Sequence, residues 1–449
     1  MNGVDTLTES VQSNPFRKRR GTLLLLISMI LILTVADAVE LHAQSGGFGE
    51  IHPQLEEYLQ IAGEENPELN ALWHQYRSEL ERVTEVGVLP DPEVNVAYTF
   101  NPMMYESIPG RFSLSAMQMF PWFGTLGARR DMQRASAEAD YHALNSRRLE
   151  LFGEIRTVWT NLSGVQIQIR IAQETLELVR DLVTLVETRY ETARAGQADL
   201  LRIQMEEERL KTLISNLEEK AFATRARFNG FLGRDPDTEV ETADRLETME
   251  LPWTRDEVVL RMHERNPRFG ELNAREQIAR EQRRLARLDG RPGFGIGLEV
   301  MGSDFGTMSM LPHSGEMVVG MASIRIPLYR SRYRSQDRQA VEQLKAVDYQ
   351  RQEVEYRLIS QLEEAFGEWR SAARSVELIT EELTPRAEQA LEILSSEYAS
   401  GNTRLDEVLQ IQRQLLDLEL ERLGELVRLH EAMIRLEALS GDGGLYRRR

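Results

Sequence analysis

Most of the chain has apolar residues at the spacing of long amphipathic helices. Between Pro121 and Pro236 no proline occurs, and apolar side chains recur at intervals of three and four residues. The pattern predicts a helix of about 65 residues over 125–190, a turn at 193–198 and a return helix about half as long. The apolar seams have nearly heptad spacing, which is typical of helices that pack as coiled coils.

The second half of the chain repeats this plan. A long helix is predicted over 330–398, with a kink at Pro385, and a return helix over 405–439. Each half also has a short helix ahead of its long one, at 55–86 and at 256–288. We expect each short helix to stack end to end on the return helix of its own half.

Four short segments alternate with period two instead, and they lie between each short helix and the following long helix. The predicted strands are 92–100, 112–120, 293–300 and 318–326. Each has one apolar face and one polar face. Their length of about nine or ten residues suits a tilted strand that spans a membrane.

Four strands cannot close a membrane barrel, because the smallest such barrels have about eight. After residue 45 no apolar stretch is long enough for a spanning helix, so entry into a membrane would require these strands. An open sheet edge is prohibitive in lipid, and the chain is therefore expected to oligomerise. Two copies would give about eight strands and a filled interior, and three would give about twelve and a hollow lumen; the pattern permits both.

Two similar motifs indicate an internal duplication. RYETARAGQADLLRIQ, which begins at Arg189, and EYASGNTRLDEVLQIQ, which begins at Glu397, align at one offset of 208 positions, and this register continues for about forty residues. Asn66-Pro67 and Asn266-Pro267 align in the same way at an offset of 200. The expected organisation is a first repeat at 50–235, an acidic linker at 236–252, a second repeat at 253–441 and a tail at 442–449.

Composition and the N-terminal residues bear on partners and compartment. The 72 acidic and 54 basic residues give a net charge of −18, which is the wrong sign for binding nucleic acid. There is no cysteine, which excludes disulfides and thiolate metal sites. Basic residues at 17–20 and an apolar run at 22–36 predict a secretory signal peptide over 1–43, cleaved after residue 38 or 43. An uncleaved inner-membrane anchor is the alternative.

The two motifs at 189 and 397, the Asn-Pro pairs and the strand-to-helix prolines Pro121 and Pro327 carry a resemblance over residues 50–441. In these features the chain resembles the TolC family of outer-membrane efflux proteins. The resemblance implies an α+β membrane protein, in which long antiparallel helical hairpins form an α-barrel and four β-strands per chain contribute to a trimeric 12-stranded outer-membrane β-barrel.

The same resemblance implies a function and partners. The chain would be the outer-membrane channel of a multi-protein efflux system, a passive homotrimeric duct for export of small molecules or metal ions. Its expected partners are a periplasmic adaptor (membrane fusion) protein, an inner-membrane efflux pump and outer-membrane lipid, with no nucleic acid. The alternatives are a periplasmic coiled-coil adaptor or structural protein, and a scaffold anchored in the inner membrane.

Site residues also follow from the resemblance. Glu407 falls on an acidic position of the family's tip constriction, and the 208 offset places Asp199 at the equivalent point, so both are expected to form a periplasmic gate. Alternatively they are first-turn carboxylates that complement a helix dipole, and both roles can hold together. Glu206 is expected on an ordinary helix face. The adaptor-contacting tips are expected to comprise Ala193, Gly196, Gly401, Asn402 and Thr403, with Ala193 where the family has glycine.

No residue set suggests catalysis, a cofactor or a resident metal. The histidines lack His-x-x-x-His spacing, and GFGIG at 293–297 lies inside an alternating strand rather than a phosphate loop. One cluster of methionines and a histidine bears on the exported cargo. Thioether and imidazole groups are suitable ligands for soft metal ions. Alternatively, these methionines only pack the loops between the strands. Its members lie between the strands and are Met103, Met104, Met308, Met310 and His313. The run QMFPWFG at 118–124 resembles the heavy-metal branch of the family.

Overall fold

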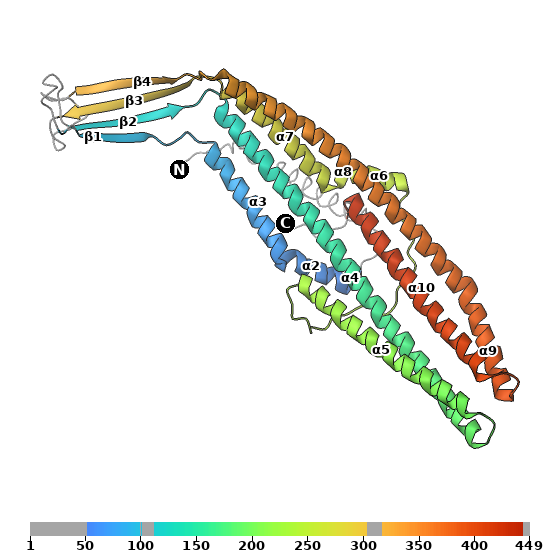
Figure 1. Ribbon diagram of the computed structural model, residues 1–449. Coiled ribbons are helices and arrows are strands. Elements are labelled where there is room, and N and C mark those ends of the chain that lie inside the picture. The colour runs from blue at the N-terminus through green and yellow to red at the C-terminus, as the bar shows by residue number, and fades with distance from the viewer. Residues whose placement is uncertain (1–51, 99, 101–111, 303–316, 443–449) are drawn as a thin grey trace, which may run out of the picture. The chain divides into compact units, whose positions relative to one another are not determined.

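Four strands pair into one antiparallel sheet in the order β1, β2, β3, β4 (Figure 1). The computed structural model describes residues 52–98, 100, 112–302 and 317–442. The strands are β1 (Glu93–Tyr98), β2 (Phe112–Phe120), β3 (Gly293–Gly302) and β4 (Met317–Arg325), close to the predicted segments. The predicted signal peptide, the Met and His cluster between strands and most of the tail lie outside the described residues.

The sheet has the two faces that the alternating pattern predicted. Side chains that pair across antiparallel strands point to the same face. One row of the apolar face consists of Val96, Leu114, Val300 and Val318. The neighbouring row, on the polar face, consists of Asn95, Ser115, Glu299 and Val319. The apolar face is uncovered in the single chain, since Val94 is 63% and Ile296 64% exposed.

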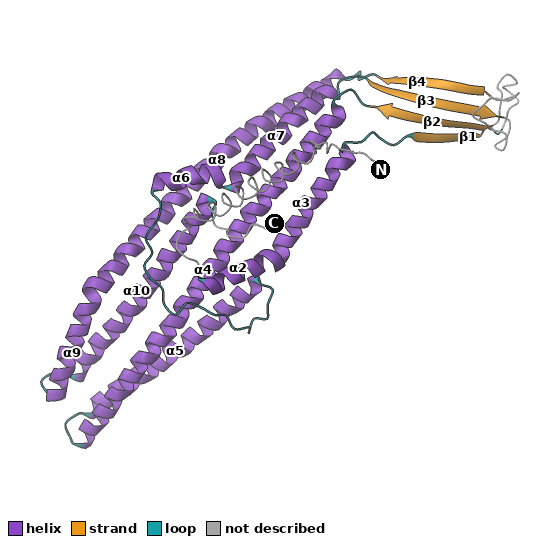
Figure 2. Ribbon diagram, turned by 180° about the vertical axis from the view of Figure 1, so that it is seen from behind, coloured by secondary structure: helices purple, strands orange, loops and turns teal. Residues whose placement is uncertain are grey.

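The first half of the chain has a long helix and a return helix about half as long, as predicted. Helix α4 (Thr125–Glu191) has 67 residues and α5 (Gln197–Phe231) has 35. The proline-free sequence allows α4 to continue for about 100 Å. The two helices lie side by side as a hairpin in both views (Figures 1 and 2).

The second half forms a similar hairpin with one interruption. Helix α8 (Arg330–Leu378) passes into a π-helical turn, η3 (Ile379–Leu383), and then into α9 (Thr384–Ser400), which α10 (Leu405–Ser440) follows. Pro385, at the start of α9, has no N–H and its ring displaces the preceding turn. The wider π turn accommodates it, so the interruption predicted at this proline is confirmed.

The prediction of one short helix per half is wrong, because each is divided in two. Helices α2 (Pro53–Glu65) and α3 (Pro67–Val86) meet at Asn66, and α6 (Arg255–Arg265) and α7 (Pro267–Leu288) meet at Asn266. A residue that precedes proline is disfavoured in the helical conformation, and both asparagines are extended, with ψ of 123° and 120°.

Each of these asparagines also joins helices end to end. The Asn66 side chain caps α3 by accepting from Glu68 N at 3.0 Å, and it donates to Phe231 O of α5 at 3.0 Å. Asn266 caps α7 in the same way and donates to Leu439 O of α10 at 3.0 Å. The expected stacking of short helices on return helices is therefore confirmed.

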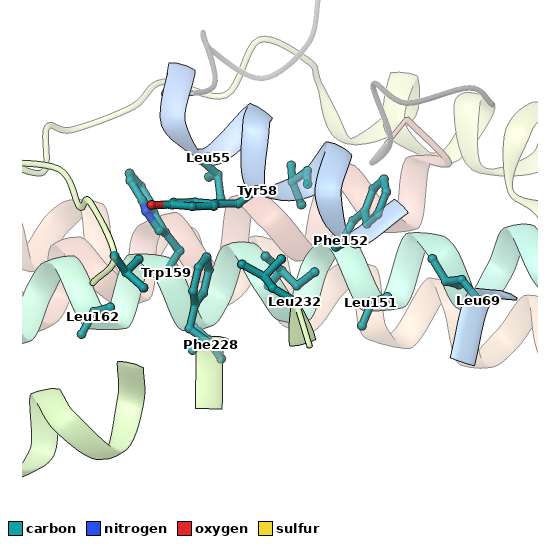
Figure 3. Close-up of a cluster of buried hydrophobic side chains, with 14 of the residues drawn as sticks. Leu55, Tyr58, Leu69, Leu151, Phe152, Trp159, Leu162, Phe228 and Leu232 are labelled. Carbon is teal, nitrogen blue, oxygen red and sulfur yellow. The ribbon is translucent and has the colours of Figure 1, made fainter. Parts of the chain in front are cut away.

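A buried apolar cluster forms the core of the first half (Figure 3). It combines residues of α2, α3, α4 and α5, including Leu55, Phe152, Trp159 and Phe228. Each fully buried side chain of this size contributes about 1.5–3 kcal/mol. The linker joins this core, since Trp159 Nε1 donates to Glu241 O at 3.0 Å. None of the helices in the described ranges is both long enough and apolar enough to cross a membrane.

A buried ion pair connects the two halves. Arg156 of α4 lies 2.6 Å from Glu437 of α10, and both side chains are almost fully buried. Burial raises the pKa of the Glu437 carboxyl, and Arg156 offsets part of that effect. Nearby, burial lowers the pKa of His430, which donates to Glu247 O of the linker at 2.9 Å. The linker therefore contacts both halves.

Candidate functional site

The two hairpins end in turns of the same backbone geometry. We call residues 192–196 the first tip and 401–404 the second tip (Figure 2). Ala193 has φ 58° and its equivalent, Gly401, has φ 83°. In each turn the amide after this position donates to a carbonyl five residues earlier, at 2.7 Å in the first tip and 2.8 Å in the second. This is the Schellman arrangement of a helix C-terminus.

Ala193 is the unusual member of this pair. It is the only residue other than glycine with positive φ in the described ranges. The left-handed conformation costs a residue with a Cβ about 1–2 kcal/mol, and glycine does not have this cost. The first tip therefore adopts the same turn as the second with an alanine in the position that favours glycine.

Asp199 lies in the first turn of α5 and is compensated locally. Its Oδ2 accepts from Gly196 N at 3.4 Å, which is one half of a capping box, since glycine has no side chain to supply the other half. Its Oδ1 lies 3.3 Å from Arg202. The carboxylate is half-buried. The first-turn role that the sequence offered as an alternative is thus present at this position.

Glu407 occupies the equivalent place in α10 but is less compensated. Its Oε2 accepts from the Thr403 hydroxyl at 2.8 Å, and the side chain is exposed. The nearby guanidinium of Arg404 pairs with Asp406 instead, at 2.9 Å. No hydrogen bond or ion pair joins Glu407 to Asp199 within the described part of one chain.

The predicted tip residues are accessible. Gly401 begins the second turn, and the only partly buried member of the set is Thr403. The exposed members are Ala193, Gly196, Gly401 and Asn402.

A link that the sequence did not predict joins the last turn of α4 to the second hairpin. The Arg189 guanidinium donates to Tyr398 O and lies over the Tyr398 ring, 4.5 Å from its centroid. Tyr398 is 5% exposed, and burial raises the pKa of its phenol. The Arg189 cation lowers this pKa in part, and the charge of Asp199 raises it slightly.

A second link lies further along the helices. Arg413 of α10 donates from Nε to Glu206 of α5 at 2.7 Å, and Arg209 lies 3.7 Å from the same carboxylate. Glu206 is 3% exposed, so the expectation of an ordinary helix face is wrong. We call the Arg189–Tyr398 and Glu206–Arg413 contacts the inter-hairpin links.

Apolar residues pack between these links. The cluster includes Val186, Ile203, Leu210, Val408 and Leu409, which come from both hairpins. It packs the two hairpins against each other next to the tips. The described residues contain no group of three or more His, Cys, Asp or Glu side chains placed to hold a metal ion. The GFGIG stretch lies within β3, as its alternation predicted.

Comparison with known proteins relates this architecture to one protein family. A family model described as outer membrane efflux protein matches residues 58–234 and 259–442. No curated protein matches the chain.

Solved structures share the fold at low sequence identity. A structure of CusC superposes with a TM-score of 0.73 at 17% identity, covering 88% of this chain and 93% of that one. The structure of VceC of Vibrio cholerae superposes with a TM-score of 0.73 at 15% identity, covering 86% of this chain and 96% of that one. The open state of the MtrE outer membrane channel of Neisseria gonorrhoeae superposes with a TM-score of 0.71 at 15% identity, covering 87% of this chain and 89% of that one. The chain therefore belongs to the outer membrane efflux protein family, whose members are outer-membrane channels of multi-protein efflux systems.

Proposed function

We propose that three copies of this chain form a passive duct for export of small molecules or metal ions. Its strands would form a twelve-stranded β-barrel in the outer membrane, and its hairpins an α-barrel in the periplasm. The observation that carries the proposal is the open sheet with an exposed apolar face. Among the described residues the outer edges of β1 and β4 are unpaired, and unpaired edges are prohibitive in lipid.

A ring of copies removes both edges. If β1 of one copy pairs with β4 of the next, the same contact repeats until the ring closes. Two copies would give about eight strands, whose interior side chains fill, whereas three give about twelve and leave a lumen. A duct requires the lumen, which favours three copies.

The helices offer a matching surface. Leu201 and Met205 lie one turn apart on α5 and are 53% and 71% exposed, and Leu178 of α4 is 55% exposed. The described part of one chain leaves more than half of each of these side chains exposed. In the proposed ring, the first hairpin of one copy would cover them against the second hairpin of its neighbour.

The tips would form the periplasmic gate. Three copies would bring six carboxylates, Asp199 and Glu407 of each chain, to the narrow end of the α-barrel. The inter-hairpin links favour the closed arrangement, because separating the hairpins would expose Tyr398 and leave Glu206 without Arg413. Opening therefore requires energy, which contact with an adaptor and an inner-membrane pump would supply.

Oligomeric mass and pore formation test the duct directly. The purified full chain in detergent should give a trimer in native mass spectrometry, and the trimer should form pores in planar bilayers. A stable monomer that forms pores would overturn the proposal. The rival adaptor function predicts instead that the protein leaves the membrane fraction on an alkaline wash, because an adaptor has no need of a sheet with an exposed apolar face.

Docking of an adaptor at the tips is tested by Gly401→Val. A β-branched side chain at φ 83° distorts the second tip, while the sheet that would assemble the ring is distant in sequence. The variant should remain trimeric and lose export when produced with its adaptor and pump. Unchanged export would count against docking at this tip.

A further inference from the structure

The methionines of the sheet are segregated onto its polar face. The described strands contain five, and the register places all of them on the face that carries Ser115 and Glu299. They are Met117, Met119, Met301, Met317 and Met321. The aromatic residues of the strands, Tyr98, Phe112, Phe120 and Phe294, all lie on the opposite, apolar face. A methionine that served only as an apolar side chain would have no reason to avoid that face.

Glycines of β3 create room for the thioethers. Gly297 pairs with Met117 on one side and Met321 on the other, and therefore separates two methionines without a side chain between them. Gly295 separates Met119 from Ser323 in the next row. A Cβ at Gly295 would lie 2.5 Å from Met119 Sδ, so the Met119 side chain lies directly across this glycine.

Ser323 brings two of the sulfur atoms together. Its Oγ lies 3.8 Å from Met117 Sδ and 3.6 Å from Met119 Sδ, within reach of a weak O–H···S hydrogen bond to either. Met321 lies two residues from Ser323 on the same strand and the same face. Two thioethers of β2 therefore lie at one hydroxyl of β4, and Met321 extends from the same face of β4 in the row of Met117. All three methionines are half-buried.

We propose that Met117, Met119 and Met321 form a binding site for a soft monovalent cation of the Cu(I) or Ag(I) class. Neutral thioethers are the ligands that such ions prefer over Na⁺ or Mg²⁺. Glu299 lies one row away on the same face and supplies a negative charge near the bound cation. The site itself depends only on the sheet. Its use as a binding point for cargo along the duct rests on the proposed function.

Calorimetric titration of Ag(I) into the purified full chain in detergent, without chloride, tests the site. Met117→Leu combined with Met119→Leu keeps the apolar volume and removes two ligands. We expect binding to weaken by about tenfold or more, given that even indirect changes to a metal site cost this much. Met132→Leu, at a half-buried methionine of α4, is the matched control and should bind as the parent does. Equal affinity in the double variant and the parent would overturn the proposal.

Met321→Leu provides an independent test from another strand, should the double variant fail to fold. It should also weaken Ag(I) binding, and parent-like affinity would again contradict the site. Native mass and pore formation of the same samples separate this inference from the duct. Ag(I) binding that depends on Met321 in a chain that forms neither trimers nor pores would retain the site and refute the duct.

Discussion

The two hairpin tips have the same backbone and different side chains. Both turns place one residue in the left-handed region, but the first uses Ala193 and the second Gly401. The tyrosines that precede these positions differ more, since Tyr190 is 43% exposed and Tyr398 only 5%. The equivalent carboxylates differ as well, because Asp199 has a cation beside it and Glu407 has a hydroxyl.

The difference shows that equivalent positions of the two hairpins have different structural roles. The last turn of α4, before the first tip, supplies Arg189, and the last turn of α9 supplies the Tyr398 ring and carbonyl that this side chain binds. At the position equivalent to Arg189 the second hairpin has Glu397, so the contact cannot be made in the reverse direction. One backbone turn, used twice, thus gives a directional link between hairpins.

Removing this link should have the largest effect. Arg189→Ala eliminates the cation–π contact and the hydrogen bond to Tyr398 O together, at a cost of about 2–3 kcal/mol. Amide hydrogen exchange in α9 and in the first turn of α10 should accelerate by about tenfold or more. Arg194→Ala, in the same turn with the same change in charge, should have no such effect. Equal acceleration in both variants would mean that loss of charge, and not the link, is responsible.

Exchanging the residues in the left-handed positions should shift stability in opposite directions. Gly401→Ala introduces a Cβ at φ 83° and should lower the free energy of unfolding by about 1–2 kcal/mol. Ala193→Gly removes the same strain from the folded chain. Glycine also gives the unfolded chain more conformational freedom, which costs about 0.4–1 kcal/mol of stability, so the variant should be as stable as the parent or more stable. Urea unfolding of both variants measures the shifts. Destabilisation of similar size in both would show that Ala193 is unstrained.

The two carboxylates should contribute unequally to ion selectivity. Glu407→Gln should reduce cation selectivity and divalent block of the pore, by about tenfold at most, because this carboxylate is bonded to a hydroxyl while the nearby Arg404 pairs with Asp406. Asp199→Asn should have a smaller effect, since Arg202 already screens this carboxylate. Glu392→Gln, at an exposed position of α9, controls for net charge. Reversal potentials in planar bilayers decide the order, and equal effects at all three positions would contradict the gate.

Burial of one tyrosine should appear as a small pH dependence. Burial holds the pKa of Tyr398 above its ordinary value of 10.0, so the folded chain keeps a proton that the unfolded chain releases. Stability should therefore fall as pH rises above about 10, and Tyr398→Phe should remove that part of the decline. Thermal unfolding between pH 9 and 11 measures it. An unchanged profile in the variant would show that the phenol does not titrate in this range.

The fold was largely predictable because regular patterns that continue over many residues determine it. Period-two alternation located all four strands, and the absence of proline set the length of α4. The divisions at Asn66 and Asn266 do not follow from apolar spacing, although both Asn-Pro pairs are visible in the sequence. Apolar spacing continues across each pair, and it does not reveal that asparagine caps one helix while it bonds to the end of another.

The site was predicted less completely, because its contacts join positions that no repeat relates. Asp199 and Glu407 share one register, whereas Arg189 contacts Tyr398 and Glu206 contacts Arg413 across the hairpins. A single sequence does not show which exposed-looking glutamate of a helix is buried against a neighbouring helix. The left-handed turn at Ala193 is likewise not evident from that residue, since propensity alone favours glycine there.

Cross-linking of the sheet edges tests the central claim most directly. The chain has no cysteine, so Val96→Cys on β1 can be combined in turn with Val318→Cys, Gly320→Cys or Ala322→Cys on β4 without background. Within one chain β2 and β3 separate these edges by about 14 Å, beyond the reach of a disulfide. The account predicts that oxidation in membranes gives covalent dimers and trimers, and nothing larger, for at least one pair. A ladder that ends at dimers, or no cross-link for any pair, would contradict the three-chain barrel.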